Sequence, residues 1–262
     1  MNICLGFFGF VREKINYEQF VNFKKLLPPD STIDIFISCP SIVDELTNEE
    51  INYESFINEM TDIFKDSSIY VNLYKYEPCI HIDKTRKLNI PDFITNHNLY
   101  SFRVVSLTFS IDVLSTFIHK HIIEQNKNYD NIILTRFDLF NSIKSFGECL
   151  IYPENGMRVI RDVNLHAEDR IIITKQLGLE KLTNLYKIYD NIEYYNSLCI
   201  TNENFFVERI LLKYLNTFND IILLEQKNLV IGLSTRFHDK YNKHDFFKKI
   251  LYAFDNQAKV LS

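Results

Sequence analysis

The sequence predicts a single α/β domain in which helices flank both faces of a mostly parallel β-sheet. Short β-rich runs alternate with helix-like stretches along the first half of the chain, which is the pattern of βαβ crossovers. The runs IDIFIS (33–38) and NIILT (131–135) are almost continuously apolar, as is typical of strands covered on both faces. Apolar residues make up 46% of the 262 residues, enough to build a core that offsets the entropy of ordering the chain.

The predicted strands and helices of the first half follow in order. Five β-rich runs bounded by turn residues are predicted strands: Ile3–Phe8, Ile33–Ser38, Ile69–Tyr74, Asn131–Thr135 and, much later, Ile221–Glu225. Helical spacing of apolar residues predicts helices over three stretches: Tyr17–Leu27, which ends at two prolines, Asn48–Phe64 and Leu99–Gln125. The segment Pro78–His97 contains Pro, Asp and Asn, and we expect an extended loop there.

The second half of the chain is less regular. An Asn-Gly turn at 155–156 predicts a hairpin with arms Leu150–Pro153 and Met157–Arg161. Further helices are predicted over Leu177–Tyr189, Glu203–Leu215 and Lys243–Phe254. The chain contains no internal repeat and no low-complexity linker, so we expect one domain over 1–262, with 1–140 and 141–262 as its halves.

Composition excludes several classes of protein. The net charge is −5 and basic residues form no block, so no nucleic-acid partner is expected; the small group Lys84, Arg86 and Lys87 is more simply a solvated loop. The five cysteines include no CxxC pair, which indicates neither a zinc site nor a disulfide framework and favours a reducing compartment. The opening apolar run has no basic segment before it, and no run has the length of a membrane span. We therefore expect a soluble, cytoplasmic protein without a signal peptide or transmembrane segment.

The first candidate site follows the first predicted strand. Ligands bind beyond the carboxyl ends of parallel strands, where Gly9 would let the backbone approach a ligand and Arg12 could pair with a diphosphate. The segment matches neither GxGxxG nor a Walker loop, so taken alone a plain turn with an exposed arginine is the simpler interpretation.

The second candidate site is the Arg-x-Asp sequence after the apolar run 131–135. If the chain stays extended, Arg136 and Asp138 share one face. Asp138 could hold a divalent cation that bridges two phosphates, and Arg136 could neutralise phosphate directly. A structural ion pair at the strand end is an equally good interpretation of this segment alone.

The third candidate site is acidic. Glu168 and Asp169 precede the apolar run 171–174, and either carboxylate could accept a proton from an acceptor hydroxyl. A solvated turn before a strand is the alternative, and for Glu168 the simpler one. Asn202 and Glu203 are explained by a capped helix start. The histidines form no compact metal-binding group and no GxSxG sequence occurs, so neither a histidine metal site nor an α/β-hydrolase is indicated.

Taken together, these segments resemble a family of small GT-A-like glycosyltransferases of surface-glycan biosynthesis in bacteria and large DNA viruses. The resemblance covers about residues 3–215 and depends on the order of weak motifs, namely Gly9–Arg12, Asp34–Ser38, Tyr129–Asp138, Glu168–Arg170 and Asn202–Glu203. Two positions depart from the family: Ser38 stands in place of the usual His, and Arg136 in place of the first Asp of an Asp-x-Asp motif.

The resemblance implies a GT-A-like, Rossmann-type fold whose residues 1–140 bind a nucleotide diphosphate sugar and whose residues 141–262 face a glycan acceptor. It implies a donor site of Gly9, Arg12, Arg136 and Asp138, with Asp138 as the remaining ligand for Mn²⁺ or Mg²⁺ and Asp169 or Glu168 as the base. Arg103 on the predicted long helix faces the donor or lies on the surface. Two alternatives remain open: a non-catalytic nucleotide- or glycan-binding protein of the same fold, and a structural or assembly protein.

Overall fold

The computed structural model describes residues 1–11, 17–43, 48–91, 93–94, 99–137, 150–161, 167–200, 205, 207–224 and 243–260. Its centre is a seven-stranded sheet with the order β3-β2-β1-β6-β8-β7-β9. The strands are β1 (Asn2–Phe8), β2 (Thr32–Pro40), β3 (Ser68–Tyr74), β6 (Asn131–Arg136), β7 (Gly156–Arg161), β8 (Ala167–Thr174) and β9 (Ile222–Leu224). Of these strands, β8 alone runs against its neighbours, so the predicted mostly parallel sheet is confirmed.

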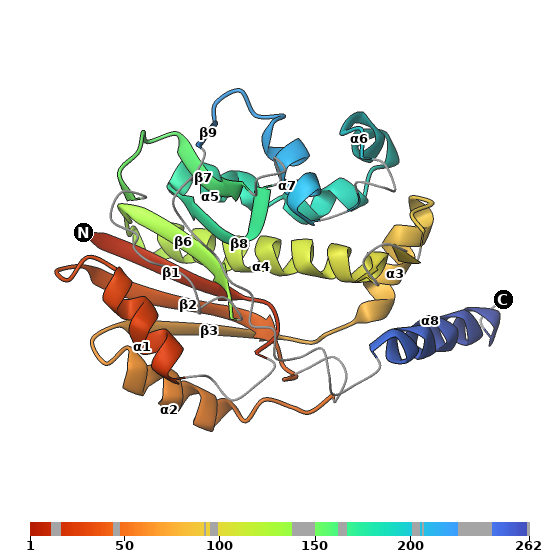
Figure 1. The fold of residues 1–262 in the computed structure, drawn as a ribbon, viewed down its shortest axis with the longest axis horizontal. Helices are drawn as coiled ribbons and strands as arrows, with labels where there is room; N and C mark the ends of the chain where they lie inside the picture. Colours follow the sequence, from red (N-terminus) through yellow and green to blue (C-terminus); the bar gives the residue numbers. More distant parts are fainter. Residues whose placement is uncertain are drawn as a thin grey trace.

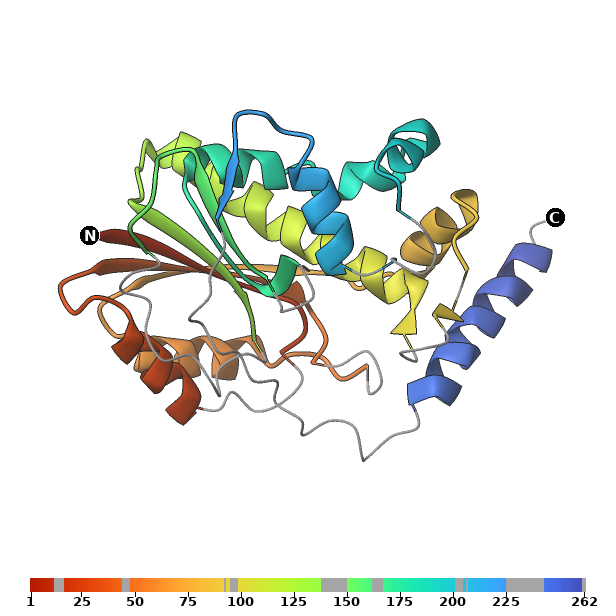
Figure 2. The same cartoon turned by 45° about the horizontal axis from the view of Figure 1, so that its top comes forward.

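Helices cover both faces of the sheet (Figure 1). One face carries α1 (Tyr17–Leu26) and α2 (Tyr53–Ile63), and the other carries α4 (Ser101–Gln125), α5 (Gln176–Leu182), the 3-10 helix η2 (Leu185–Tyr189) and α7 (Val207–Leu215). The remaining elements are α3 (Pro78–Lys87), α6 (Ile192–Ser197), α8 (Lys243–Val260) and a two-stranded pair of β4 (Phe93–Ile94) and β5 (Leu99–Tyr100). Figure 2 shows α8 beside α3, at the end of the molecule away from the start of β1.

Alternate residues of the central strands point to opposite faces of the sheet and belong to two separate cores, as strand geometry requires. Phe7 and Ile133 pack with α1 and α2 on one face. Phe8 and Leu134 pack with Leu114 of α4 on the other. The expectation of a sheet buried on both faces is therefore confirmed. The helix α4 is long and apolar enough to span a membrane, but the share of its most apolar window buried inside the protein is 61%, as in the core helix of a globular domain.

The loop predicted over Pro78–His97 is wrong in its first half, which is the helix α3. Pro78 occupies the first helical turn, where a missing N–H costs nothing. The helix is held by tertiary packing, since it buries His81 and Ile82. The expected solvated basic loop is also wrong: Lys84 lies on α3 with its side chain 15% exposed.

The predicted hairpin at 150–161 is wrong in its first arm. The turn exists, with the Gly156 N–H bound to the carbonyl of Pro153 at 2.8 Å. However, residues 151–153 form no strand, because β8 and β9 occupy the two edges of β7. The single helix predicted over Leu177–Tyr189 is two elements, α5 and η2, and the predicted start of α7 at Glu203 moves to Val207.

Candidate functional site

The strand order reverses at β1. The first crossover runs through α1 to β2 on one side of β1, and α4 carries the chain back to β6 on the other side. In open sheets of this kind, the carboxyl ends of the two strands at the reversal border the ligand crevice. The ends of β1 and β6 therefore border the place where a ligand would bind.

Arg136 ends β6 at this point and is paired in register with Phe8, the last residue of β1. Phe8 is in turn paired with Ser38 of β2, and Ser38 with Asn72 of β3. Because Leu134 belongs to the core under α4, Arg136 two residues later lies on the same face. The paired residues Arg136, Phe8, Ser38 and Asn72 form a row across four strands, and this row is polar at both ends. Arg136 is partly exposed, and the Asn72 amide donates to the Ser38 hydroxyl at 3.1 Å.

Gly9 follows β1 with a φ of +90°, a backbone conformation that other residues rarely adopt. Among the described residues, no heavy atom lies within 4 Å of the place a Cβ would take. The next residue, Phe10, contacts Tyr76 edge-to-face with ring centroids 4.9 Å apart, and both rings are partly exposed. Arg12 lies outside the described residues, so its predicted role stays a prediction.

Arg103 lies on the side of α4 that faces the sheet. It precedes Ser110 by about two helical turns, which places both residues on one face of the helix. The Ser110 hydroxyl is 2.8 Å from the hydroxyl of Tyr74, the last residue of β3. Since α4 leads into the amino end of β6, its own start points to the carboxyl edge, and Arg103 lies about 10 Å further along the axis than Ser110. The backbone therefore directs Arg103 towards the same edge as Arg136.

The acidic pair Glu168 and Asp169 lies within β8, so the turn expected before the strand is wrong. The strand is antiparallel to β6, with Ile171 paired to Thr135. Residues before Ile171 therefore lie at or beyond the carboxyl end of β6. The backbone of Glu168 and Asp169 thus reaches the edge that carries Arg136, while their side chains lie outside the described part.

Asp138 lies outside the described residues. The strand β6 ends at Arg136, and Phe137 sits in a turn with its ring stacked on Phe7 at 5.5 Å. A continuing strand therefore does not place Arg136 and Asp138 on one face. Within the described ranges, no group of three or more His, Cys, Asp or Glu side chains could hold a metal ion. The described residues alone thus do not form a metal site, and the Asp138 metal site stays a prediction.

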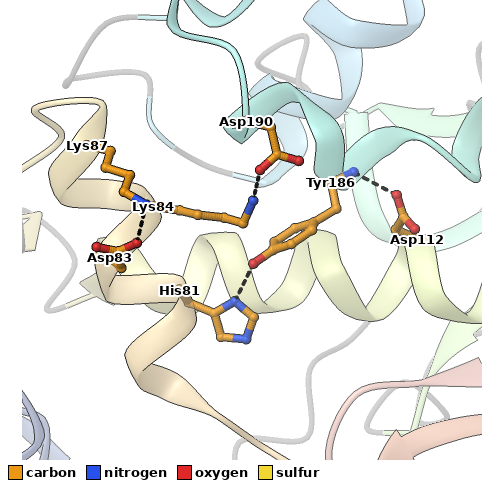
Figure 3. A network of polar contacts seen from close by, with 7 residues as sticks. All are labelled: His81, Asp83, Lys84, Lys87, Asp112, Tyr186 and Asp190. Atoms are coloured by element: carbon orange, nitrogen blue, oxygen red, sulfur yellow. Dashed lines mark hydrogen bonds and ion pairs between the residues drawn. The ribbon is translucent and has the colours of Figure 1, made fainter.

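A polar network around Tyr186 was not predicted from the sequence (Figure 3). The backbone N–H of Tyr186 donates to Asp112 of α4 at 2.8 Å, and its hydroxyl lies 3.0 Å from Nδ1 of His81 on α3. Lys84 of α3 forms an ion pair with Asp190, which ends η2. The partners are between 74 and 106 residues apart in the chain, so local sequence patterns contain no signal for their contact.

Burial shifts two pKa values in this network, in opposite directions. Burial, assisted by the nearby Lys84 charge, lowers the pKa of His81 from 6.5 to about 4, so its imidazole is neutral at pH 7. Burial also raises the pKa of Asp112 from 3.8 to about 6, although the Tyr186 N–H partly opposes the shift.

No protein-family model matches the chain, and no curated protein matches it by sequence. Three solved structures are similar in part. The first is the apo structure of the bifunctional glycosyltransferase WbbM, with 12% identity, a TM-score of 0.39, and coverage of 86% of this chain but 38% of WbbM. The second is the PaToxG glycosyltransferase, with 15% identity, a TM-score of 0.37, and coverage of 83% of this chain and 68% of that one.

The third is a nucleoside-diphosphate-sugar pyrophosphorylase from Vibrio cholerae, with 7% identity, a TM-score of 0.38, and coverage of 88% of this chain and 94% of that one. This chain thus spans well under half the length of WbbM. The mixed, mostly parallel sheet flanked by helices is the α/β fold that the sequence predicts, and the function proposed below rests on the residues at its carboxyl edge.

Proposed function

We propose that this protein is a glycosyltransferase that moves a sugar from a nucleotide diphosphate sugar to a hydroxyl of a glycan acceptor. One observation carries the proposal: Arg136 ends β6 in register with Phe8, where the strand order reverses and the open Gly9 follows. A permanent cation at this edge matches the charge of a diphosphate. The ordered motifs over residues 3–215 agree with this assignment.

Arginines would bind the diphosphate. Arg136 and Arg103 approach the edge from β6 and α4, and Arg12 follows Gly9 in the chain. Guanidinium groups bind phosphate oxygens through paired, charge-assisted hydrogen bonds. Because the diphosphate gains negative charge as the sugar–phosphate bond breaks, the same contacts stabilise the transition state more than the ground state.

The base of the nucleotide would lie against aromatic rings. Phe10 and Tyr76 meet beside Gly9 and are partly exposed. An aromatic face stabilises a stacked base without selecting one sequence of hydrogen-bonding groups. We therefore expect Phe10 and Tyr76 to contribute to affinity for the nucleotide more than to the choice among bases.

An acidic residue at the start of β8 would activate the acceptor. Asp169 is the proposed base, with Glu168 as the alternative, for removing the proton of the attacking hydroxyl in an inverting reaction. Asp138 is the proposed ligand of a Mn²⁺ or Mg²⁺ ion, which when bound would offset phosphate charge. The arginines bind the donor whether or not this ion is needed.

A ligand screen tests the proposal. The wild-type protein is screened by thermal shift against UDP-, GDP- and dTDP-sugars, with and without Mn²⁺, and the best donor is then assayed for hydrolysis and for transfer to glycan acceptors. We expect a raised Tm with one nucleotide class and slow donor hydrolysis. Binding without turnover across the donors and acceptors would instead support a nucleotide-binding protein, and no shift with any nucleotide would contradict the proposal.

A further inference from the structure

The helix η2 packs against the first half of the chain, and its Tyr186 side chain contacts both α3, at His81, and α4, at Phe109. Figure 3 shows this side chain reaching from η2 towards α3, with its hydroxyl at His81. Its ring lies 4.5 Å from Nζ of Lys84 and 4.9 Å from the ring centre of Phe109. Its backbone N–H is held by Asp112. Tyr186 is therefore fixed by its N–H, its ring and its hydroxyl at once.

The contacts of Tyr186 continue to the carboxyl edge of the sheet. The His81 ring lies 5.8 Å from that of Tyr186 and 6.3 Å from that of Tyr76. Tyr76 in turn contacts Phe10, the residue after Gly9. His81 is only 4% exposed and fills the space between the two tyrosines, so a change in its orientation must alter the surroundings of Tyr76.

We propose that Tyr186 is a positioning residue: its hydroxyl orients His81, which holds Tyr76 against Phe10 at the carboxyl edge. The hydroxyl does not touch the edge itself and acts through His81. That Tyr76 then supports donor binding rests on the proposed function, whereas the orientation of Tyr76 does not.

Titration affects the two ends of this arrangement differently. The groups that face Asp112 are Tyr186, Lys187 and Asp190 from η2 and the residue that ends it, Thr116 from α4, and Tyr214 from α7. The groups that face His81 are Lys84 from α3, Glu77 at the N-cap of α3, and Tyr186 from η2. Protonated His81 has no acceptor nitrogen, so the Tyr186 hydroxyl would then have to accept from Nδ1–H, and the imidazolium charge would lie beside Lys84. We therefore expect the contact of the neutral His81 ring with Tyr186 to persist at neutral pH and to change only as the pH falls towards 4.

The test removes the hydroxyl and nothing else. Tyr186→Phe is compared with Tyr129→Phe, which also deletes a buried tyrosine hydroxyl, one that donates to Asp34 at 2.6 Å near the opposite end of the sheet. The chain contains no tryptophan, so Tyr76→Trp introduces a single fluorescent reporter at the edge. Hydrogen exchange over 78–87 in chains without the reporter gives a second measurement.

We expect Tyr186→Phe to shift the emission of the introduced tryptophan and to speed exchange over 78–87 at least threefold at pH 7, with Tyr129→Phe changing neither. In the transfer assay, we expect a three- to tenfold rise in the donor KM and a change in kcat below twofold. Equal spectra and equal exchange in the two variants would overturn the proposal. If no donor binds the wild type, the proposed function fails, but emission and exchange still decide whether Tyr186 positions the side chain at position 76.

Discussion

Arg136 and Phe8 are paired residues at the ends of two adjacent parallel strands, β6 and β1, where the order of the sheet reverses. Phe8 is fully buried, whereas Arg136 is partly exposed on the same face. The end of β6 is thus paired with the buried Phe8, whereas its own last side chain, Arg136, is partly exposed and carries a permanent charge. This relationship locates the proposed donor site.

Arg136→Ala and Asp138→Ala should each abolish turnover and leave the Tm within a few degrees of wild type. The reason is that Arg136 ends its strand and is partly exposed, so its loss removes charge from the edge without opening the core. Transfer assays and thermal unfolding check this. Retained activity in both variants would end the assignment of these two residues.

Asp169→Asn should lower kcat by at least about a hundredfold while leaving donor affinity nearly unchanged, because a general base acts on the acceptor hydroxyl and not on the nucleotide. Glu168→Gln is the matched control from the adjacent position. Single-turnover kinetics with saturating donor measure the effect. A large loss for Glu168→Gln with none for Asp169→Asn would reassign the base to Glu168.

Gly9→Ala should destabilise the protein by about 1 to 2 kcal/mol, because φ at this position is +90°, a backbone conformation that is strained for alanine. Steric clash adds nothing to this cost, since the Cβ would meet open space among the described residues. The same methyl group would also occupy the space in which the backbone approaches the donor. Denaturant unfolding and donor titration together check both effects. A variant as stable as wild type would show that the turn relaxes.

Asp34→Ala should lower the free energy of unfolding by about 2 to 3 kcal/mol, because the Tyr129 hydroxyl and the Lys127 ammonium both bind this carboxylate, which is 5% exposed. The contact joins the start of β2 to the segment before β6, far from the carboxyl edge. Donor affinity measured below the unfolding temperature should therefore stay within twofold of wild type. A selective loss of donor affinity would contradict this separation.

The stability of the protein should depend on pH through Asp112 and His81 in opposite ways. The fold raises the pKa of Asp112 to about 6, against 3.8 for an ordinary aspartate, so this residue makes folding more favourable as the pH falls from 6 to 4. The fold keeps His81 neutral down to about pH 4, against 6.5, so its contribution is present above 6.5 and is lost as the pH falls to 4. For His81 the loss is at most about 3 kcal/mol.

Single variants separate the two contributions. As the pH falls, unfolding free energy should drop more steeply than in wild type for Asp112→Asn, which keeps an acceptor for the Tyr186 N–H. It should drop less steeply for His81→Gln. Urea unfolding at several pH values between 4 and 7 measures both slopes. Parallel curves for all three proteins would show that folding shifts the pKa of neither group.

Patterns along the chain predict the strands and the crossover helices because burial on both faces leaves apolar runs and helical spacing in the sequence. Those patterns do not predict α3, since its sequence is polar and only His81, Ile82 and Thr85 are buried, against neighbours distant in the chain. They also misplace the start of β8, because pairing with β7, which reaches Ala167 opposite Arg161, extends the strand through charged residues that suggest a turn.

The sequence likewise predicts the place of some residues of the candidate site and not of others. Gly9 and Arg136 follow apolar strands directly, so their place at the carboxyl edge can be predicted from strand ends alone. The approach of Arg103 from α4 depends on the contact between Ser110 and Tyr74, which no local pattern encodes. The Tyr186 network joins residues of three helices and emerges only when the chain folds.

Whether a diphosphate binds at Arg136 can be decided by isothermal titration of nucleoside diphosphates into the wild type, Arg136→Ala and Arg158→Ala. Arg158 is a matched control, because its pairing with Ile173 places it on the other face of the sheet, the face to which α1 and α2 belong. We expect Arg136→Ala to weaken binding at least about tenfold, or about 1.4 kcal/mol, while Arg158→Ala binds like wild type. Equal affinity in all three proteins would contradict the placement of a diphosphate at Arg136.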